Sequence, residues 1–198
     1  MTAFAGFAFV VMTAAAALLV ADAPAAGASA ADVADYFDDA HVRIVTSVYL
    51  QGLALALFVW FLSGLAWRLH SGGAPLRARV AYGAGLIAMT LFGLAAVVLG
   101  ALAFRATDDT SLAQSLFDVA VFSQNTAAFP IAVLVAAGWR SWRGAVLAAI
   151  FLVDAATVAE DGFFAPDGGY SRVAAILFLG WVAAASAELL FPGRPAPR

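Results

Sequence analysis

The chain of 198 residues contains no cysteine and few charged residues. Without cysteine it cannot form a disulfide, a thiol nucleophile or a cysteine-bound metal cluster. Only 12% of its residues are charged and 64% are hydrophobic, whereas a soluble domain carries roughly 25% charged residues. So little charge cannot cover a water-soluble globule, and the composition therefore indicates a membrane protein.

Lysine is also absent, because all ten basic residues are arginine. We interpret this as a bias in composition and not as chemistry. The formal net charge is only −3, and nucleic-acid-binding domains are usually strongly basic. No nucleic-acid partner is therefore expected.

Charged and turn residues divide the chain into six apolar stretches. About 20 helical residues cross a hydrocarbon core of roughly 30 Å. The predicted spans are residues 2–21, 44–69, 80–104, 112–139, 144–159 and 173–191. We therefore expect an all-α, single-domain transmembrane bundle over residues 1–198. Pro130 predicts a kink in the fourth span.

Arginine is distributed unevenly over the loops between these stretches. With a cytoplasmic N-terminus, seven of the ten arginines lie on the cytoplasmic side, namely Arg68, Arg77, Arg79, Arg140, Arg143, Arg194 and Arg198. Trp67, Trp139 and Trp142 lie at the same boundary, where indole rings are enriched. The positive-inside rule therefore predicts six spans with both termini in the cytoplasm.

The first stretch has a second interpretation, because Ala28-Ser29-Ala30 resembles a signal-peptidase site. A secretory signal has a basic n-region and an apolar core of about 7–15 residues. Here no basic residue precedes the apolar core, which is longer than that. We expect a retained helix; cleavage would leave five helices and an external N-terminus.

A short external helix is predicted at about residues 30–41. Ser29 followed by Asp32 is a variant of the capping box. Apolar residues recur at helical spacing while four acids point elsewhere: Asp32, Asp35, Asp38 and Asp39. We expect an amphipathic helix on the outer membrane surface. The acids lack the spacing of an EF-hand, so a solvated face is favoured over a calcium site.

Three predicted spans carry polar stripes in their outer halves. Ser115, Asp118 and Asn125 share a face of the fourth span, and Asp154 and Thr157 share a face of the fifth. In the second span the stripe consists of Arg43, Ser47 and Gln51. Asp118 and Asp154 each lie about six residues, roughly 9 Å, below the outer boundary. The stripes predict an outward-facing vestibule in which the two acids lie at equal depth.

The two acids support a functional and a structural interpretation. A charged carboxylate inside the bilayer costs on the order of 2.5–3.5 kcal/mol, so such residues often bind ligands or protons. Alternatively, the acids hydrogen-bond neighbouring helices or pair with Arg43 or Arg105, and hold the bundle together. Both interpretations remain open at this point.

No residue pattern indicates a cofactor or a metal. His41 and His70 lie on opposite sides of the predicted membrane and cannot share a haem. The chain has no glycine-rich phosphate loop and no hydrolase or zinc-protease motif. Glu188 near the inner end of the last span is expected to form a salt bridge with Arg140, Arg143 or Arg194.

Two segments carry a family resemblance. The first is Ala-Asp-Tyr-Phe-Asp-Asp-Ala-His with Tyr49, Gly52 and Trp60-Phe61-Leu62 after it, and the second is Ala-Gln-Ser-Leu-Phe-Asp onward to Ala-Ala-Phe-Pro. Both resemble uncharacterised six-helix membrane proteins of high-GC Gram-positive bacteria. The resemblance implies this architecture and a bacterial plasma-membrane location, and it implies no activity.

Three functions are compatible with these observations. The first is binding or transport of a small polar solute, a cation or protons through the vestibule. The second is an accessory subunit, either in a homo-oligomer or with another membrane protein, for which Ala96 and Gly100 offer a patch of small residues. The third is an enzyme acting on a lipid or isoprenoid with paired carboxylates. Transport ranks first, because the polar residues face one compartment and no catalytic motif accompanies them.

Overall fold

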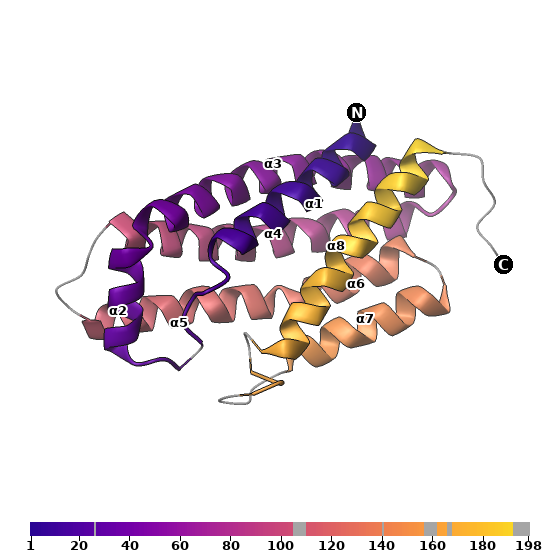
Figure 1. The fold of residues 1–198 in the computed structure, drawn as a ribbon. Coiled ribbons are helices and arrows are strands. Elements are labelled where there is room, and N and C mark those ends of the chain that lie inside the picture. Colours follow the sequence, from indigo (N-terminus) through magenta and orange to yellow (C-terminus); the bar gives the residue numbers. More distant parts are fainter. Residues whose placement is uncertain (26, 105–109, 140, 157–161, 166–167, 192–198) are drawn as a thin grey trace.

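In a computed structural model the chain folds as a bundle of α-helices, and no strand occurs in the part that the structure describes. That part comprises residues 1–25, 27–104, 110–139, 141–156, 162–165 and 168–191. Its helices are α1 (Thr2–Leu19), α2 (Ala30–Asp39), α3 (His41–Ser71), α4 (Pro75–Phe104), α5 (Thr110–Thr126), α6 (Ala128–Gly138), α7 (Trp142–Ala155) and α8 (Gly169–Leu190). Figure 1 shows α1, α3 and α4 alongside one another, with α8 crossing the bundle at a steep angle. The predicted all-α class is confirmed.

Five segments are long and apolar enough to cross a membrane. They are α1, α3, α4, α8 and the combined segment Thr110–Gly138, which contains α5 and α6. Helix α7 has only 14 residues, or about 21 Å, against a hydrocarbon core of roughly 30 Å. The described chain is therefore a multi-pass membrane protein with five such segments. The end of the predicted span 144–159 falls on residues 157–159, which lie outside the described residues.

Several helices extend beyond the predicted apolar stretches. Helix α4 begins at Pro75 and not at residue 80, because proline fits the first position of a helix, where its missing N–H has no partner to lose. Helix α3 begins at His41 and ends at Ser71. Hydropathy marks the apolar part of a helix, and polar turns at either end continue the same backbone.

We call the end of the bundle where α1 begins and α3 and α8 end the basic end, and the end where α2 lies the α2 end (Figure 1). At the basic end, Thr2 at the start of α1 lies against Gly64 near the end of α3. Arg68 of α3 donates there to Glu188 of α8, at 2.7 Å between Nη1 and Oε2. The opposite end of the bundle is closed by α2 (Figure 1).

The Arg68–Glu188 ion pair corrects the predicted partners of Glu188. Arg143 lies over the Trp142 ring instead, 5.9 Å from its centroid. Arg140 and Arg194 lie outside the described residues. Glu188 pairs with Arg68 because the C-terminal ends of α3 and α8 meet, which the order of the helices along the chain does not reveal.

Helix α2 begins as predicted and packs differently. The Ser29 hydroxyl accepts a hydrogen bond from the Asp32 N–H at 3.2 Å and donates to its carboxylate at 2.7 Å. The apolar face of α2 is buried against protein and not against a membrane surface, since Val33 is 0% exposed and the Phe37 and Phe117 rings lie 6.2 Å apart. This packing forms the α2-end cluster, which consists of Val33, Phe37, Ala40, Ile44, Leu102, Ala103, Ala113 and Phe117.

The fourth apolar segment breaks where Pro130 predicts. Helix α5 ends at Thr126 and α6 begins at Ala128. Pro130 has no N–H to donate to the Thr126 carbonyl, and its ring crowds that carbonyl. The Ala127 N–H is shared between the Ser123 and Gln124 carbonyls, both at 3.2 Å. The predicted kink is confirmed.

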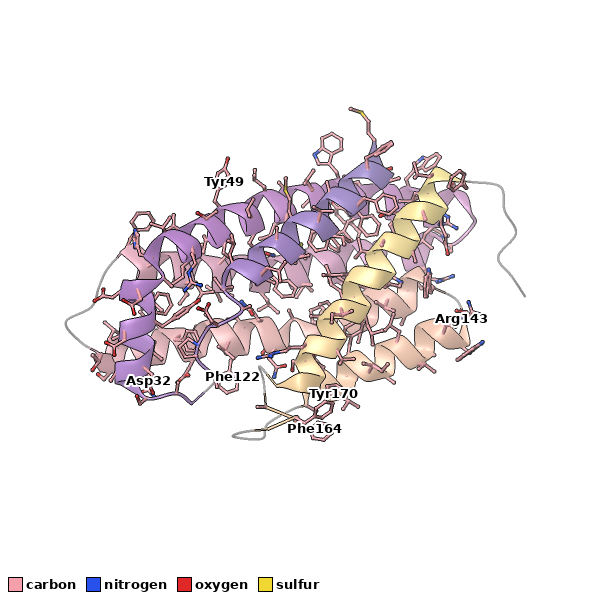
Figure 2. All side chains as sticks on the ribbon, viewed as in Figure 1. Asp32, Tyr49, Phe122, Arg143, Phe164 and Tyr170 are labelled. Carbon is pink, nitrogen blue, oxygen red and sulfur yellow. The ribbon has the colours of Figure 1, made fainter. Side chains whose placement is uncertain are left out.

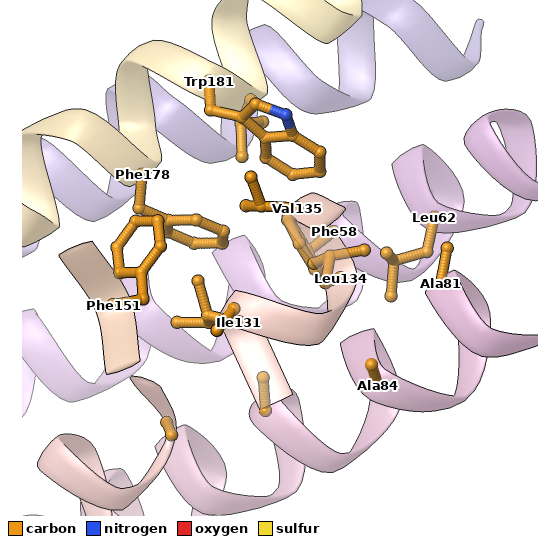
Figure 3. Close-up of a cluster of buried hydrophobic side chains, with 14 of the residues drawn as sticks. Phe58, Leu62, Ala81, Ala84, Ile131, Leu134, Val135, Phe151, Phe178 and Trp181 are labelled. Atoms are coloured by element: carbon orange, nitrogen blue, oxygen red, sulfur yellow. The ribbon is translucent and has the colours of Figure 1, made fainter. Parts of the chain in front are cut away.

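A second cluster, the bundle core, lies nearer the basic end. Aromatic rings from four helices meet there, with the Phe58 and Phe178 centroids 5.9 Å apart and those of Phe178 and Trp181 6.1 Å apart. Figure 3 shows Ile131, Phe151 and Phe178 grouped around one point of this core. These contacts set the relative heights of α6, α7 and α8, and with them the positions of the polar residues.

Candidate functional site

Arg43 lies in the first turn of α3 and pairs with Asp22, which follows α1. Its Nη1 and Nη2 donate to the two carboxylate oxygens of Asp22 at 3.1 and 2.9 Å. One turn farther along α3, the Ser47 hydroxyl donates to the Ala16 carbonyl at 2.9 Å. Arg43 and Ser47 of the predicted α3 stripe therefore bind α3 to α1 and to the residues that follow α1.

The Asp22–Arg43 pair predicts a small loss of stability in acid. Hydrogen bonds from Arg43 hold the pKa of the Asp22 carboxyl below its usual value of 3.8. An acid with a lowered pKa stabilises the folded state above its unfolded pKa, and this contribution disappears as the pH falls through the folded pKa. The stability gap between wild type and Asp22→Asn should be constant above about pH 5 and close below pH 3.8.

Thermal unfolding in detergent between pH 3 and pH 7 measures this gap. Both partners are about half exposed, so the gap should be small and should shrink further in high salt. A gap that persists unchanged at pH 3 would contradict the assignment.

Asp118 lies in the middle of α5 and is half-buried near the α2 end. Its neighbour Phe117 belongs to the α2-end cluster and touches Phe37 of α2. The exposed Ser115 hydroxyl donates to the Ser111 carbonyl of its own helix at 2.9 Å. Ser115 and Asp118 of the predicted α5 stripe therefore lie near the α2 end.

Asp154 lies in the last turn of α7 and is 8% exposed. The Ser171 hydroxyl in the first turn of α8 lies beside its carboxyl. The Tyr170 hydroxyl donates to the Ile150 carbonyl, one turn before Asp154, at 3.0 Å. Asp154 therefore lies between the C-terminal end of α7 and the N-terminal end of α8, whose dipoles have opposite effects on a negative charge.

The two acids do not lie at equal depth. Ile131 and Phe151 both belong to the bundle core (Figure 3). Asp154 is three residues from Phe151, or about 5 Å, whereas Asp118 is thirteen residues from Ile131, or about 20 Å. Both intervals run toward the α2 end, so Asp118 lies farther along the bundle than Asp154 does. The structure therefore does not bring Asp118 and Asp154 into one site.

Three predicted site residues remain, namely Asn125, Gln51 and Thr157. Asn125 is half-buried in the last turn of α5, six residues or about 9 Å from Ile131, and is therefore closer in depth to Asp154 than Asp118 is. Helices α5 and α7 also contact each other. Gln51 is half-buried on α3, and Thr157 lies outside the described residues.

Sequence reasoning missed Tyr170 and Ser171. The predicted last span begins at residue 173, which puts both residues before it, whereas α8 begins at Gly169. A tyrosine and a serine at the start of an apolar stretch are the signal that was available. Only the packing of α8 on α7 shows that they lie beside Asp154.

The predicted patch of small residues has an internal partner. A Cβ on Gly100 would lie 3.4 Å from Val48 Cγ1 of α3. Gly100 therefore helps α4 approach α3, as small residues do between membrane helices.

Potential ligands for a metal are sparse. Among the described residues, no three histidine or acidic side chains gather closely enough to hold a metal ion. Searches for related proteins found no matching family model, no matching curated protein and no matching solved structure. Function is therefore inferred from the residues themselves.

Proposed function

We propose that this membrane protein binds and conducts protons or a small cation at Asp154. The observation that carries the proposal is a carboxyl that is 8% exposed within a helix bundle of membrane-spanning length. The proposed surroundings of the ligand are the Asp154 carboxyl, the Ser171 hydroxyl and the C-terminal end of α7. The negative end of the α7 dipole favours a bound cation or proton there.

Depth in the membrane supports Asp154 over Asp118. We take the basic end as cytoplasmic, in agreement with the positive-inside rule, and Trp139 and Trp142 as markers of the inner boundary. Asp154 is then twelve residues from Trp142, or about 18 Å into a hydrocarbon core of roughly 30 Å. Asp118 is twenty-one residues from Trp139, or about 31 Å of helix, which supports a position near the outer boundary.

This difference in depth gives the two acids different roles. A carboxylate at the outer boundary is solvated and needs no special reason to be there. One held inside the core costs on the order of 2.5–3.5 kcal/mol when charged, and acids at that depth commonly bind ions or relay protons. We further propose that the protein crosses a bacterial plasma membrane six times, with the predicted stretch 144–159 as the fifth span.

Flux measurements in proteoliposomes test the proposal. Proton, sodium and potassium flux are compared for wild type, Asp154→Asn and the matched variant Asp118→Asn. Wild type should exceed empty liposomes for at least one of these ions, Asp154→Asn should fall to the level of empty liposomes, and Asp118→Asn should keep wild-type flux.

Two results would overturn the proposal. Wild-type flux that survives Asp154→Asn would leave Asp154 as a structural residue that joins α7 to α8. Absence of flux in wild type would favour the accessory role, and the next measurement would then be the identity of proteins and lipids that co-purify with the chain.

A further inference from the structure

Three aromatic rings pack together where α7 and α8 meet. Phe163 and Phe164 precede α8, and Tyr170 lies in its first turn. The ring centroids lie 5.1 Å apart for Phe163 and Phe164, 5.9 Å for Phe163 and Tyr170, and 5.6 Å for Phe164 and Tyr170. Figure 2 shows Phe164 and Tyr170 together at this end of α8. We call these three residues the aromatic cluster.

Hydrogen bonds attach the aromatic cluster to both helices. The Tyr170 N–H donates to the Phe163 carbonyl at 3.0 Å, so the segment before α8 folds back onto its first turn. The Tyr170 hydroxyl reaches across to the Ile150 carbonyl of α7 at 3.0 Å. Tyr170 thus bridges the two helices one turn from Asp154, and this hydroxyl is its one side-chain hydrogen bond among the described residues.

Two glycines shape the backbone around the aromatic cluster. Gly162 has a φ of +84°, which side-chain-bearing residues rarely adopt. The Phe163 ring lies over Gly169, where a Cβ would come within 2.7 Å of it. Phe163 and Phe164 nevertheless remain 57% and 50% exposed, so neither ring is held in the bundle core. Among the described residues, the Tyr170 hydroxyl connects the aromatic cluster to α7.

We propose that the aromatic cluster is a closed gate over Asp154, held shut by the hydrogen bond from Tyr170 to Ile150. This rests on the proposed function, because a gate is needed only if Asp154 exchanges a ligand with water. Release of the Tyr170 hydroxyl lets the ring and the two phenylalanines move away from the seam between α7 and α8. Water and a cation then reach Asp154 from the α2 end. Tyr170 is a positioning residue, since it acts on the ligand through access to Asp154.

The absence of cysteine allows a direct test, because an introduced thiol is the only one in the chain. Asp154→Cys is made with Tyr170, with Tyr170→Phe and with Tyr170→Ala, and is reconstituted in vesicles. A membrane-impermeant, positively charged methanethiosulfonate is added on the side of the α2 end, and the rate of labelling is measured. Ser171→Cys serves as a second reporter, because serine and cysteine differ little in size.

Labelling should be slow with Tyr170 present. It should rise about fivefold in Tyr170→Phe, the change expected from the loss of one hydrogen bond, and further in Tyr170→Ala, which removes the ring. Asp118→Cys is the matched control and should label rapidly at a rate that does not depend on residue 170.

The outcomes separate the gate from the proposed function. Equal and rapid labelling in all three backgrounds would overturn the gate and leave an accessible Asp154, in agreement with flux through that residue. No labelling of either reporter, even with Tyr170→Ala, would overturn the gate as well. In that case the flux of Asp154→Asn vesicles separately decides whether Asp154 has any role in transport.

Discussion

Replacing Trp181 by alanine should lower the free energy of unfolding by about 3–5 kcal/mol, the usual cost of removing a large aromatic residue from a packed core. Trp181 is 2% exposed. Its ring lies 6.1 Å from that of Phe178 and 6.2 Å from that of Phe61, and it covers Gly138 of α6. Membrane helices associate mainly through such packing, since lipid is as apolar as the core.

Unfolding in detergent mixtures, followed by far-ultraviolet circular dichroism, measures this loss. Trp142→Ala is the matched control, because Trp142 is 71% exposed and its removal should change stability by no more than about 0.5 kcal/mol. Equal losses in the two variants would contradict the assignment of Trp181 to the centre of the bundle core.

The second large effect is expected at Gly6, where α1 packs tightly against α8. A Cβ on Gly6 would lie 2.0 Å from Ser186 Oγ and 2.7 Å from Phe61 Cδ2. Ser186 is 0% exposed, and its Cβ would also lie only 3.2 Å from the added Cβ. Gly6→Val should therefore separate α1 from α8 and cost about 3 kcal/mol or more, the upper part of the range for overpacked cores.

Two comparisons make the result at Gly6 specific. Gly180→Val should be nearly neutral, because nothing lies within 4 Å of a Cβ at that position. Gly6→Ala should be harmful alone and less harmful combined with Ser186→Gly, since the second change removes the nearest obstacle. If Gly6→Val and Gly180→Val unfold alike, the close approach of α1 to α8 is wrong.

Local features of the fold were readable from the sequence. Ser29 and Asp32 marked the start of α2, and their hydrogen bonds involve residues only three apart. Pro130 marked the break between α5 and α6, because proline removes a bond within its own helix. Five of the six predicted apolar stretches coincide with the five long segments for the same reason, since length and hydropathy belong to one continuous piece of chain.

Partners across the bundle were not readable in the same way. The sequence predicts Arg140, Arg143 or Arg194 as the partner of Glu188, and its partner is Arg68, 120 residues away. Arg43 was placed in a vestibule and pairs with Asp22. In each case the residue types were right for an ion pair. The choice among partners depends on which helix ends meet, and hydropathy carries no such information.

The sequence by itself determined that this is an all-α, multi-pass membrane protein, because composition and helix length are properties of the chain. It also determined that two acids, Asp118 and Asp154, lie in apolar segments. Tertiary structure decided that these acids have different neighbours, since Asp118 follows Phe117 of the α2-end cluster and Asp154 lies beside Ser171. The physical reason is that packing of rings such as Phe151 on Phe178 sets how far each helix slides along its neighbours.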